Sequence, residues 1–135
     1  MPYASFHVSG APLDDAARNR LHRGATDLIE RIFDAPRKIV AIRIVDDTGS
    51  EWSVGGEILT SREDPGRTGI IARVTISEAS ATGDRLETAI AELSAMLKAL
   101  LGSNALPPYI VFDLIPERAW GFRNRSLAAI RAAST

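Results

Sequence analysis

One pattern occurs twice in this sequence, and the repeat restricts the possible folds more than any other feature. Each half contains a strand-like apolar segment, a long segment with helical periodicity and a second strand-like segment. Each half then reaches a turn that contains a tryptophan, Trp52 in the first half and Trp120 in the second. Because internal repetition is stronger evidence than any single element, we expect two βαβ units in one chain.

In the first half, alternating apolar and polar side chains predict a strand over residues 2–8. The spacing of the next apolar residues predicts a helix of about five turns. Asp14 or Asp15 favours its start, and Pro36 ends it because the residue before a proline is pushed out of the helical region. Further extended segments are predicted at residues 39–45 and, as a short strand or hairpin around Gly55-Gly56, at residues 52–59.

The second half repeats this plan. A helix is predicted at residues 84–101, with Gly102 as the signal for its end. Strands are predicted at residues 70–77 and 107–115, and residues 123–135 form either a terminal helix or an irregular end. The predicted division of the single domain is a first unit at 1–60, a linker at 61–69, a second unit at 70–122 and a C-terminal tail at 123–135.

These elements predict an α+β fold. A right-handed crossover in each βαβ unit gives a four-stranded mixed sheet with both helices on one face. The other face is then uncovered, and a chain of 135 residues is small enough to gain stability from oligomerisation, so we expect a ring of subunits. A monomeric ferredoxin-like α+β sandwich with the same elements is the alternative.

The composition excludes several classes of function. The 16 basic and 17 acidic residues are mixed along the chain, so neither a nucleic-acid nor a membrane partner is expected. No apolar run approaches the length of a membrane span. The absence of cysteine excludes disulfides, thiolate metal sites and cysteine nucleophiles, and His7 and His22 are too few to suggest zinc. We therefore expect a cytoplasmic protein without a metal site.

Pro2 is the candidate catalytic residue. It directly follows the initiator methionine and begins a strand, where its missing N–H is tolerated. Removal of Met1 would make Pro2 a secondary amine, and an apolar pocket with cationic neighbours would lower the pKa of that amine. The neutral amine could take a proton from beside a carbonyl and return it to another carbon. If Met1 is retained, the Pro2 nitrogen is an amide without basicity, and Pro2 is an ordinary strand proline.

Three segments resemble the tautomerase superfamily: Pro2, Phe-Asp-Ala-Pro at residues 33–36, and Trp-Ser-Val-Gly-Gly-Glu-Ile at residues 52–58. The first 60 residues are similar to the 4-oxalocrotonate tautomerase subunit, one βαβ unit followed by a Gly-Gly hairpin. The second half resembles the long members that carry two fused units, and residues 115–122 look like the corresponding stretch of those members. The resemblance implies a trimer of two-unit chains, with Pro2 at the base of a pocket near a subunit boundary and no cofactor.

The arginines that bind substrate in the family are displaced or absent here. The position after the first strand is occupied by residues 11–12, Ala-Pro, and residues 75–80 lack the arginine pair of the hydrating and decarboxylating members. The arginine of the second strand falls at Ala41, and Arg43 lies two residues further on the same face. We therefore predict Arg43 and Arg73 as the substrate-binding cations; an exposed side chain or an ion pair at a subunit interface is the alternative for each.

Aromatic and acidic residues complete the predicted site. Trp52 takes the place of an aromatic wall residue of the short tautomerases, and Trp120 and Phe122 are candidates to line the pocket; packing is the alternative for all three. Asp47 and Glu117 are candidates to activate a water molecule, with a solvated turn as the alternative.

The predicted function is that of a cofactor-independent, isomerase-type enzyme. It would interconvert the keto and enol forms of a small, phenylpyruvate-like 2-oxo acid, with Pro2 as general acid and base. One alternative is a hydratase, dehalogenase or decarboxylase of small unsaturated or 3-oxo acids that uses the same proline. Another is an inactive trimer with the tautomerase fold that acts as a binding protein. The expected partners are a small carboxylate substrate and two further copies of the chain.

Overall fold

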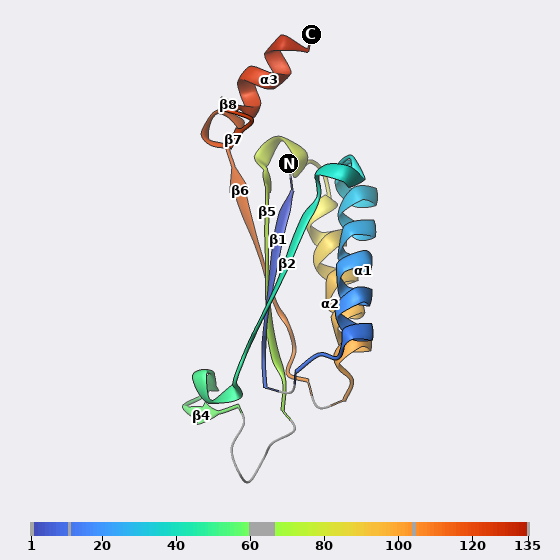
Figure 1. Cartoon of the computed structure of the whole chain (residues 1–135), viewed down its shortest axis with the longest axis vertical. Helices are drawn as coiled ribbons and strands as arrows, with labels where there is room; N and C mark the ends of the chain where they lie inside the picture. Colours follow the sequence, from blue (N-terminus) through green and yellow to red (C-terminus); the bar gives the residue numbers. More distant parts are fainter. Residues whose placement is uncertain (1, 11, 60–66, 104, 135) are drawn as a thin grey trace.

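A computed structural model of the chain describes residues 2–10, 12–59, 67–103 and 105–134. The described residues form a four-stranded sheet with two long helices on one face, and α3 lies beyond one end of the sheet (Figure 1). The sheet strands are β1 (Tyr3–Ser9), β2 (Ala41–Asp47), β5 (Gly69–Ser77) and β6 (Tyr109–Ile115). The helices are α1 (Asp15–Phe33), α2 (Arg85–Leu101) and α3 (Leu127–Ala133). Two hairpins pair β3 (Ser53–Val54) with β4 (Glu57–Ile58) and β7 (Gly121–Phe122) with β8 (Arg125–Ser126).

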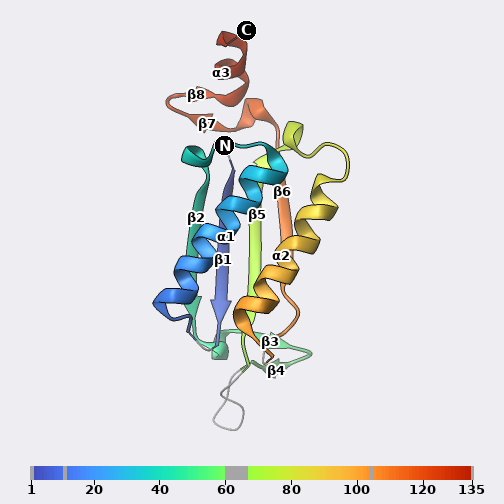
Figure 2. The same ribbon diagram turned by 90° about the vertical axis from the view of Figure 1, so that its right-hand side faces the viewer.

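The sheet has the strand order β2-β1-β5-β6. The central pair β1–β5 is antiparallel, whereas each outer strand runs parallel to its inner neighbour. Helices α1 and α2 run side by side across one face (Figure 2). The predicted α+β fold, with a mixed four-stranded sheet and both helices on one face, is therefore confirmed.

The internal repeat is regular in the structure: equivalent positions of the two halves lie 68 residues apart, as the starts of β2 at Ala41 and of β6 at Tyr109 show. The same spacing relates β3 to β7 and β4 to β8, and it relates Trp52 to Trp120. The residues predicted as a tail, 123–135, thus include the second half of a hairpin and α3. The predicted linker, 61–69, lies mostly outside the described residues, and its last residue, Gly69, begins β5.

The core lies between the sheet and the two helices. Ala4, Phe6 and Val8 point from β1 into this layer, as their alternation predicts. Leu21 on α1 and Leu93 on α2 are fully buried against them. Burying such side chains contributes about 1.5–3 kcal/mol each, so this layer holds the helices on the sheet.

The first helix begins and ends where the sequence predicts. The carboxylate of Asp14 accepts a hydrogen bond from the N–H of Ala17 (2.7 Å) and so caps the helix. Asp34 ends the helix in the left-handed conformation, with a φ of 53°. The strand predicted at residues 39–45 begins instead at Ala41, because residues 37–39 form a 3₁₀ turn that the proline before it initiates.

The second face of the sheet is uncovered in the single chain. It presents Tyr3, Arg43, Arg73 and Tyr109, with Tyr3 36% and Tyr109 56% exposed. Apolar, aromatic and charged side chains therefore lie together on a face that no other layer of the described chain covers. None of the helices in the described part of the chain combines the length and the apolar character needed to cross a bilayer.

Candidate active site around Pro2

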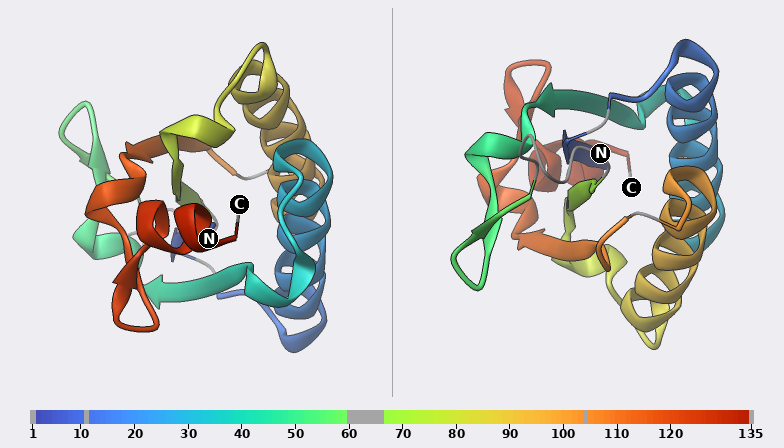
Figure 3. Two further views of the ribbon diagram at one scale, coloured as in Figure 1. Left: turned by 90° about the horizontal axis from the view of Figure 1, so that it is seen from above. Right: turned by 90° about the horizontal axis from the view of Figure 1, so that it is seen from below.

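Pro2 is buried at the end of the sheet where β1 begins. Its carbonyl oxygen accepts a hydrogen bond from the N–H of Ala41 (3.1 Å), which ties it to the start of β2. Seen from above, α3 lies over this end of the sheet, close to the start of the chain (Figure 3, left). Besides β1 and the start of β2, the last turn of α1, the end of β5 and the start of α2 lie around Pro2.

A cavity of about 290 Å³ adjoins Pro2. This volume is at the lower end of the range of small-molecule sites. Its lining combines apolar side chains with two guanidinium groups, one carboxylate and two serines. The residues that line it are Pro2, Phe33, Asp34, Ala35, Pro36, Ile39, Ile76, Ser77, Ala79, Ser80, Arg85 and Arg131.

Arg85 brings one positive charge to the cavity. It is the first residue of α2, and its side chain is half-buried. One Nη atom donates a hydrogen bond to the carbonyl oxygen of Ser80 (3.1 Å), in the turn after β5. The guanidinium is thereby held near Pro2 and is suited to stabilise negative charge on a bound ligand.

A second positive charge comes from Arg131 on α3. Its Nε atom lies 2.9 Å from Oε1 of Glu117. The same carboxylate oxygen accepts a hydrogen bond from the hydroxyl of Ser77 (3.0 Å), at the end of β5. The carboxylate of Glu117 thus links Ser77 on the sheet to Arg131 on the C-terminal helix, beside the cavity.

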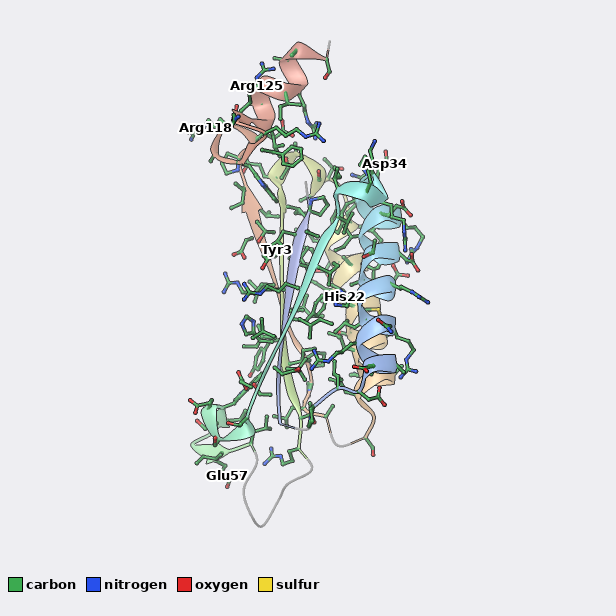
Figure 4. The ribbon with its side chains drawn as sticks, in the orientation of Figure 1. Tyr3, His22, Asp34, Glu57, Arg118 and Arg125 are labelled. Atoms are coloured by element: carbon green, nitrogen blue, oxygen red, sulfur yellow. The ribbon has the colours of Figure 1, made fainter. Side chains whose placement is uncertain are left out.

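Asp34 is the carboxylate of the cavity lining. Figure 4 places it at the same end of the molecule as Arg118 and Arg125, with Glu57 of the first hairpin at the other end. Its left-handed backbone conformation is one that Asp adopts more readily than most residues other than glycine. An exposed carboxylate in this position could accept a proton or orient a water molecule beside a ligand.

Three of the residues predicted for the site lie at the Pro2 end of the sheet. Glu117 contacts Ser77, which lines the cavity. Phe122 lines an adjoining cavity of about 370 Å³, and Ile39 is common to both cavities. Trp120 lies at the base of the second hairpin, where its carbonyl oxygen accepts a hydrogen bond from the N–H of Leu127 (2.9 Å).

The other predicted residues lie elsewhere in the single chain. Arg43 and Arg73 flank Ser5 in the middle of the uncovered face, and Arg73 is paired with Asp113 (2.8 Å). Asp47 pairs with Ser9, the last residue of β1. Strand geometry puts that end of β1 about 20 Å from the beginning of the strand.

Trp52 also lies at the end of the sheet opposite Pro2. Its ring packs beside Tyr109 with a centroid distance of 6.4 Å and leaves no room for a side chain at Gly69. Pro2, Glu117, Trp120 and Phe122 are therefore brought to one end within a chain, whereas Arg43, Arg73, Asp47 and Trp52 are not.

The sequence did not point to Arg85, Arg131 or Ser77 as site residues. The family pattern places its arginines on or directly after strands, whereas Arg85 and Arg131 belong to helices. Arg131 also lies in the segment predicted as a tail. The repeat was the one signal in the sequence that could have pointed to two of them. If the first strands of the two units pair antiparallel, the end of β5 lies beside the start of β1, and the residues that follow β5 then lie near Pro2.

Comparison with known proteins supports the fold. No protein-family model matches the sequence, and no curated protein sequence matches it. Solved structures do match over almost the whole chain. The structure described as Pt0534 inactivated by 2-oxo-3-pentynoate has a TM-score of 0.81 at 18% identity and covers 95% of this chain and 98% of that chain.

Two further solved structures match over a similar share of the chain. A fused 4-OT described as a wild-type symmetric trimer has a TM-score of 0.78 at 20% identity, with 95% of this chain and 98% of that chain covered. A macrophage migration inhibitory factor-like protein from Entamoeba histolytica has a TM-score of 0.72 at 16% identity, with 93% and 98% covered. At these identities the likeness shows a common fold, and the predicted resemblance is confirmed at that level.

Proposed function

We propose that this chain is a tautomerase-superfamily enzyme that interconverts the keto and enol forms of a small 2-oxo acid, with the amine of Pro2 as general acid and base. The observation that carries this proposal is the position of Pro2, which is buried and lines a cavity together with Arg85 and Arg131. A small anionic ligand would be attracted by the two guanidinium groups, and apolar lining residues such as Phe33, Ile39 and Ile76 would suit its hydrocarbon part.

The catalytic form is the one in which Met1, which lies outside the described residues, has been removed. Burial of the Pro2 nitrogen and the nearby guanidinium groups disfavour the ammonium form of the amine. The neutral amine takes the hydroxyl proton of an enol at C2, and the resulting ammonium gives a proton to C3, so the enol becomes the keto acid. Negative charge develops on the oxygen at C2 during this transfer, and Arg85 is placed to stabilise it.

The substrate class is supported by a protein of the same fold. Pt0534 is described as inactivated by 2-oxo-3-pentynoate, which is a small 2-oxo acid. We expect the same reagent to modify the processed chain by addition of the neutral Pro2 amine to the alkyne, with no atom lost. The modification would be read as a mass increase equal to the mass of the reagent.

We further propose that the chain assembles as a homotrimer, as the fused 4-OT is described to do. The uncovered sheet face, with Tyr3, Tyr109 and the two strand arginines, would then be buried between subunits. Arg43, Arg73, Trp52 and Asp47 could contribute to a Pro2 cavity only from a neighbouring subunit. Static light scattering at micromolar concentration should give three times the mass of one chain; a monomer mass would contradict this assembly.

The Pro2→Ala variant tests the proposed function. General acid–base catalysis contributes about 10²–10⁴-fold, so the conversion of phenylpyruvate enol should slow by at least about 100-fold. Intact-mass measurement must first show that both proteins lack Met1. The matched control is Pro12→Ala, an exposed proline at the other end of the sheet, which should retain the parent rate. A Pro2→Ala variant as fast as its parent would refute the catalytic role of Pro2.

A further inference from the structure

We infer that Arg131, on the C-terminal helix α3, binds the carboxylate of the substrate, and that Glu117 is the residue that positions it. The identity of the ligand rests on the proposed function, whereas the binding role rests on the contacts of Arg131. Helix α3 is then part of the active site and determines its preference for acids.

The contacts of the guanidinium leave its binding edge available. Glu117 approaches the Nε atom of Arg131, and no second carboxylate lies within ion-pair distance of Arg131 among the described residues. The two Nη atoms form the side of the planar fork that matches the two oxygens of a carboxylate. The Arg131 side chain is 63% exposed while it lines the Pro2 cavity, so a ligand can reach it.

Glu117 holds the guanidinium relative to the sheet. Its side chain is only 18% exposed, and it accepts a hydrogen bond from Ser77, which is 3% exposed at the end of β5. Ser77 lines the same cavity as Pro2. The orientation of Arg131 is therefore fixed by a buried contact of the sheet and not by α3 alone, as a substrate-positioning group requires.

Helix α3 is attached firmly at its start. The hydroxyl of Ser126 accepts a hydrogen bond from the N–H of Ala129 (3.0 Å), and Leu127 is 8% exposed. The helix packs against the short turn that contains Glu117. Arg131 and Glu117 thus belong to one packed unit at the edge of the cavity.

A binding experiment separates this role from turnover. The probes are 3-phenylpropionate, which carries a carboxylate, and 3-phenylpropanamide, its neutral counterpart; both are titrated calorimetrically into the processed parent and its variants. Arg131→Gln should weaken acid binding about 10- to 100-fold, because it removes a charge-assisted bidentate contact, and should leave amide binding unchanged. Arg131→Lys, which keeps the charge but loses the fork, should give an intermediate loss.

Glu117→Ala should weaken acid binding about threefold to tenfold, again without an effect on the amide, since it removes only the positioning of Arg131. The matched control is Arg118→Gln, an exposed arginine next to Glu117 that does not line the cavity, and it should bind both probes as the parent does. Thermal unfolding of each variant shows whether the fold is retained.

The outcomes distinguish the two levels of inference. If the parent prefers the acid, Arg131→Gln abolishes the preference and phenylpyruvate is not converted, the carboxylate-binding role stands and the proposed reaction fails. If phenylpyruvate is converted but Arg131→Gln leaves acid binding and the KM unchanged, the role of Arg131 is refuted alone. A parent that does not prefer the acid also refutes it, and a Glu117→Ala variant that binds the acid as tightly as the parent refutes the positioning role.

Discussion

The internal repeat gives the central sheet two related ends. At one end β1 begins beside the end of β5, at the other β5 begins beside the end of β1, and there is a cavity at each. The cavity at the second end, about 210 Å³, is lined by residues that include Ala17, Thr68 and Leu101. The repeat spacing of 68 residues relates Leu101 to Phe33 of the Pro2 cavity. The backbone frame is therefore present twice.

The side chains of the proposed mechanism, Pro2, Arg85 and Arg131, lie at one of these two ends. At the second end, Ile70 takes the position of Pro2 in the repeat, and Ala17 takes that of Arg85. Ile70 lies within the chain, so its nitrogen is an amide and cannot act as a base. A duplicated frame thus supplies two cavities, and the proposed function distinguishes them by a few side chains and by α3, which follows the second hairpin.

Removing Arg85 should make the Pro2 end resemble its counterpart and should have the largest effect. The Arg85→Ala variant has alanine at this position, as the other half of the repeat has at Ala17. It lacks the charge that is proposed to stabilise the enolate oxygen. We expect kcat for phenylpyruvate enol to fall by about 10²–10³, the loss typical of a removed oxyanion donor. Arg20→Ala, at the rim of the second cavity, is the control and should keep kcat. Equal kcat values for the parent, Arg85→Ala and Arg20→Ala would show that Arg85 does not stabilise the enolate oxygen.

Leu59 and Leu127 occupy equivalent places and should sharpen the comparison through stability. Each N–H donates to the carbonyl oxygen of the preceding tryptophan of its half, at 2.8 and 2.9 Å, and each side chain is buried. Leu59→Ala should lower the free energy of unfolding by about 2–5 kcal/mol, as for other buried leucines, and should not change the affinity for 3-phenylpropionate.

Leu127→Ala should have a smaller effect on global unfolding, because Leu127 is less completely buried than Leu59 (8% against 1% exposed) and α3 packs mainly on the second hairpin and the turn before it. It should instead weaken 3-phenylpropionate binding, since Leu127 anchors the helix that carries Arg131. Urea unfolding and the calorimetric titration measure the two effects. If both variants lose the same stability and neither changes binding, α3 is not part of the site.

The fold could be predicted because its determinants are local. The alternation in β1, the helical spacing of α1 and α2 and the repeated tryptophans each act within one segment, and two such units leave few possible sheets. The predicted start of β2 lies two residues too early, because Ile39 belongs to a 3₁₀ turn after Pro36 and Val40 ends that turn, although both are β-branched residues typical of strands.

The site could be predicted only in part, because its geometry joins segments far apart in sequence. Pro2 was recognisable from its position and from the resemblance. Arg85 and Arg131 reach the Pro2 cavity from α2 and α3, and no local pattern reports that approach. The register of β1 with β2 puts Asp47 beside Ser9, at the other end of the sheet, and that consequence of pairing is likewise invisible in composition or spacing.

The turns of the two hairpins have the same backbone conformation but different residues. They test whether the residues of each turn suit that conformation equally well. Gly55-Gly56 and Arg123-Asn124 all have positive φ angles. A side chain at Gly56 would meet no neighbouring atom, so Gly56→Ala should cost only the left-handed backbone penalty, about 1–2 kcal/mol of unfolding free energy. Asn124→Gly should change stability in the opposite direction by up to about 1 kcal/mol, because glycine adopts this conformation without that penalty. Urea midpoints that move in the same direction for both variants would show that the second turn is stabilised by contacts of Asn124 and not merely by backbone conformation.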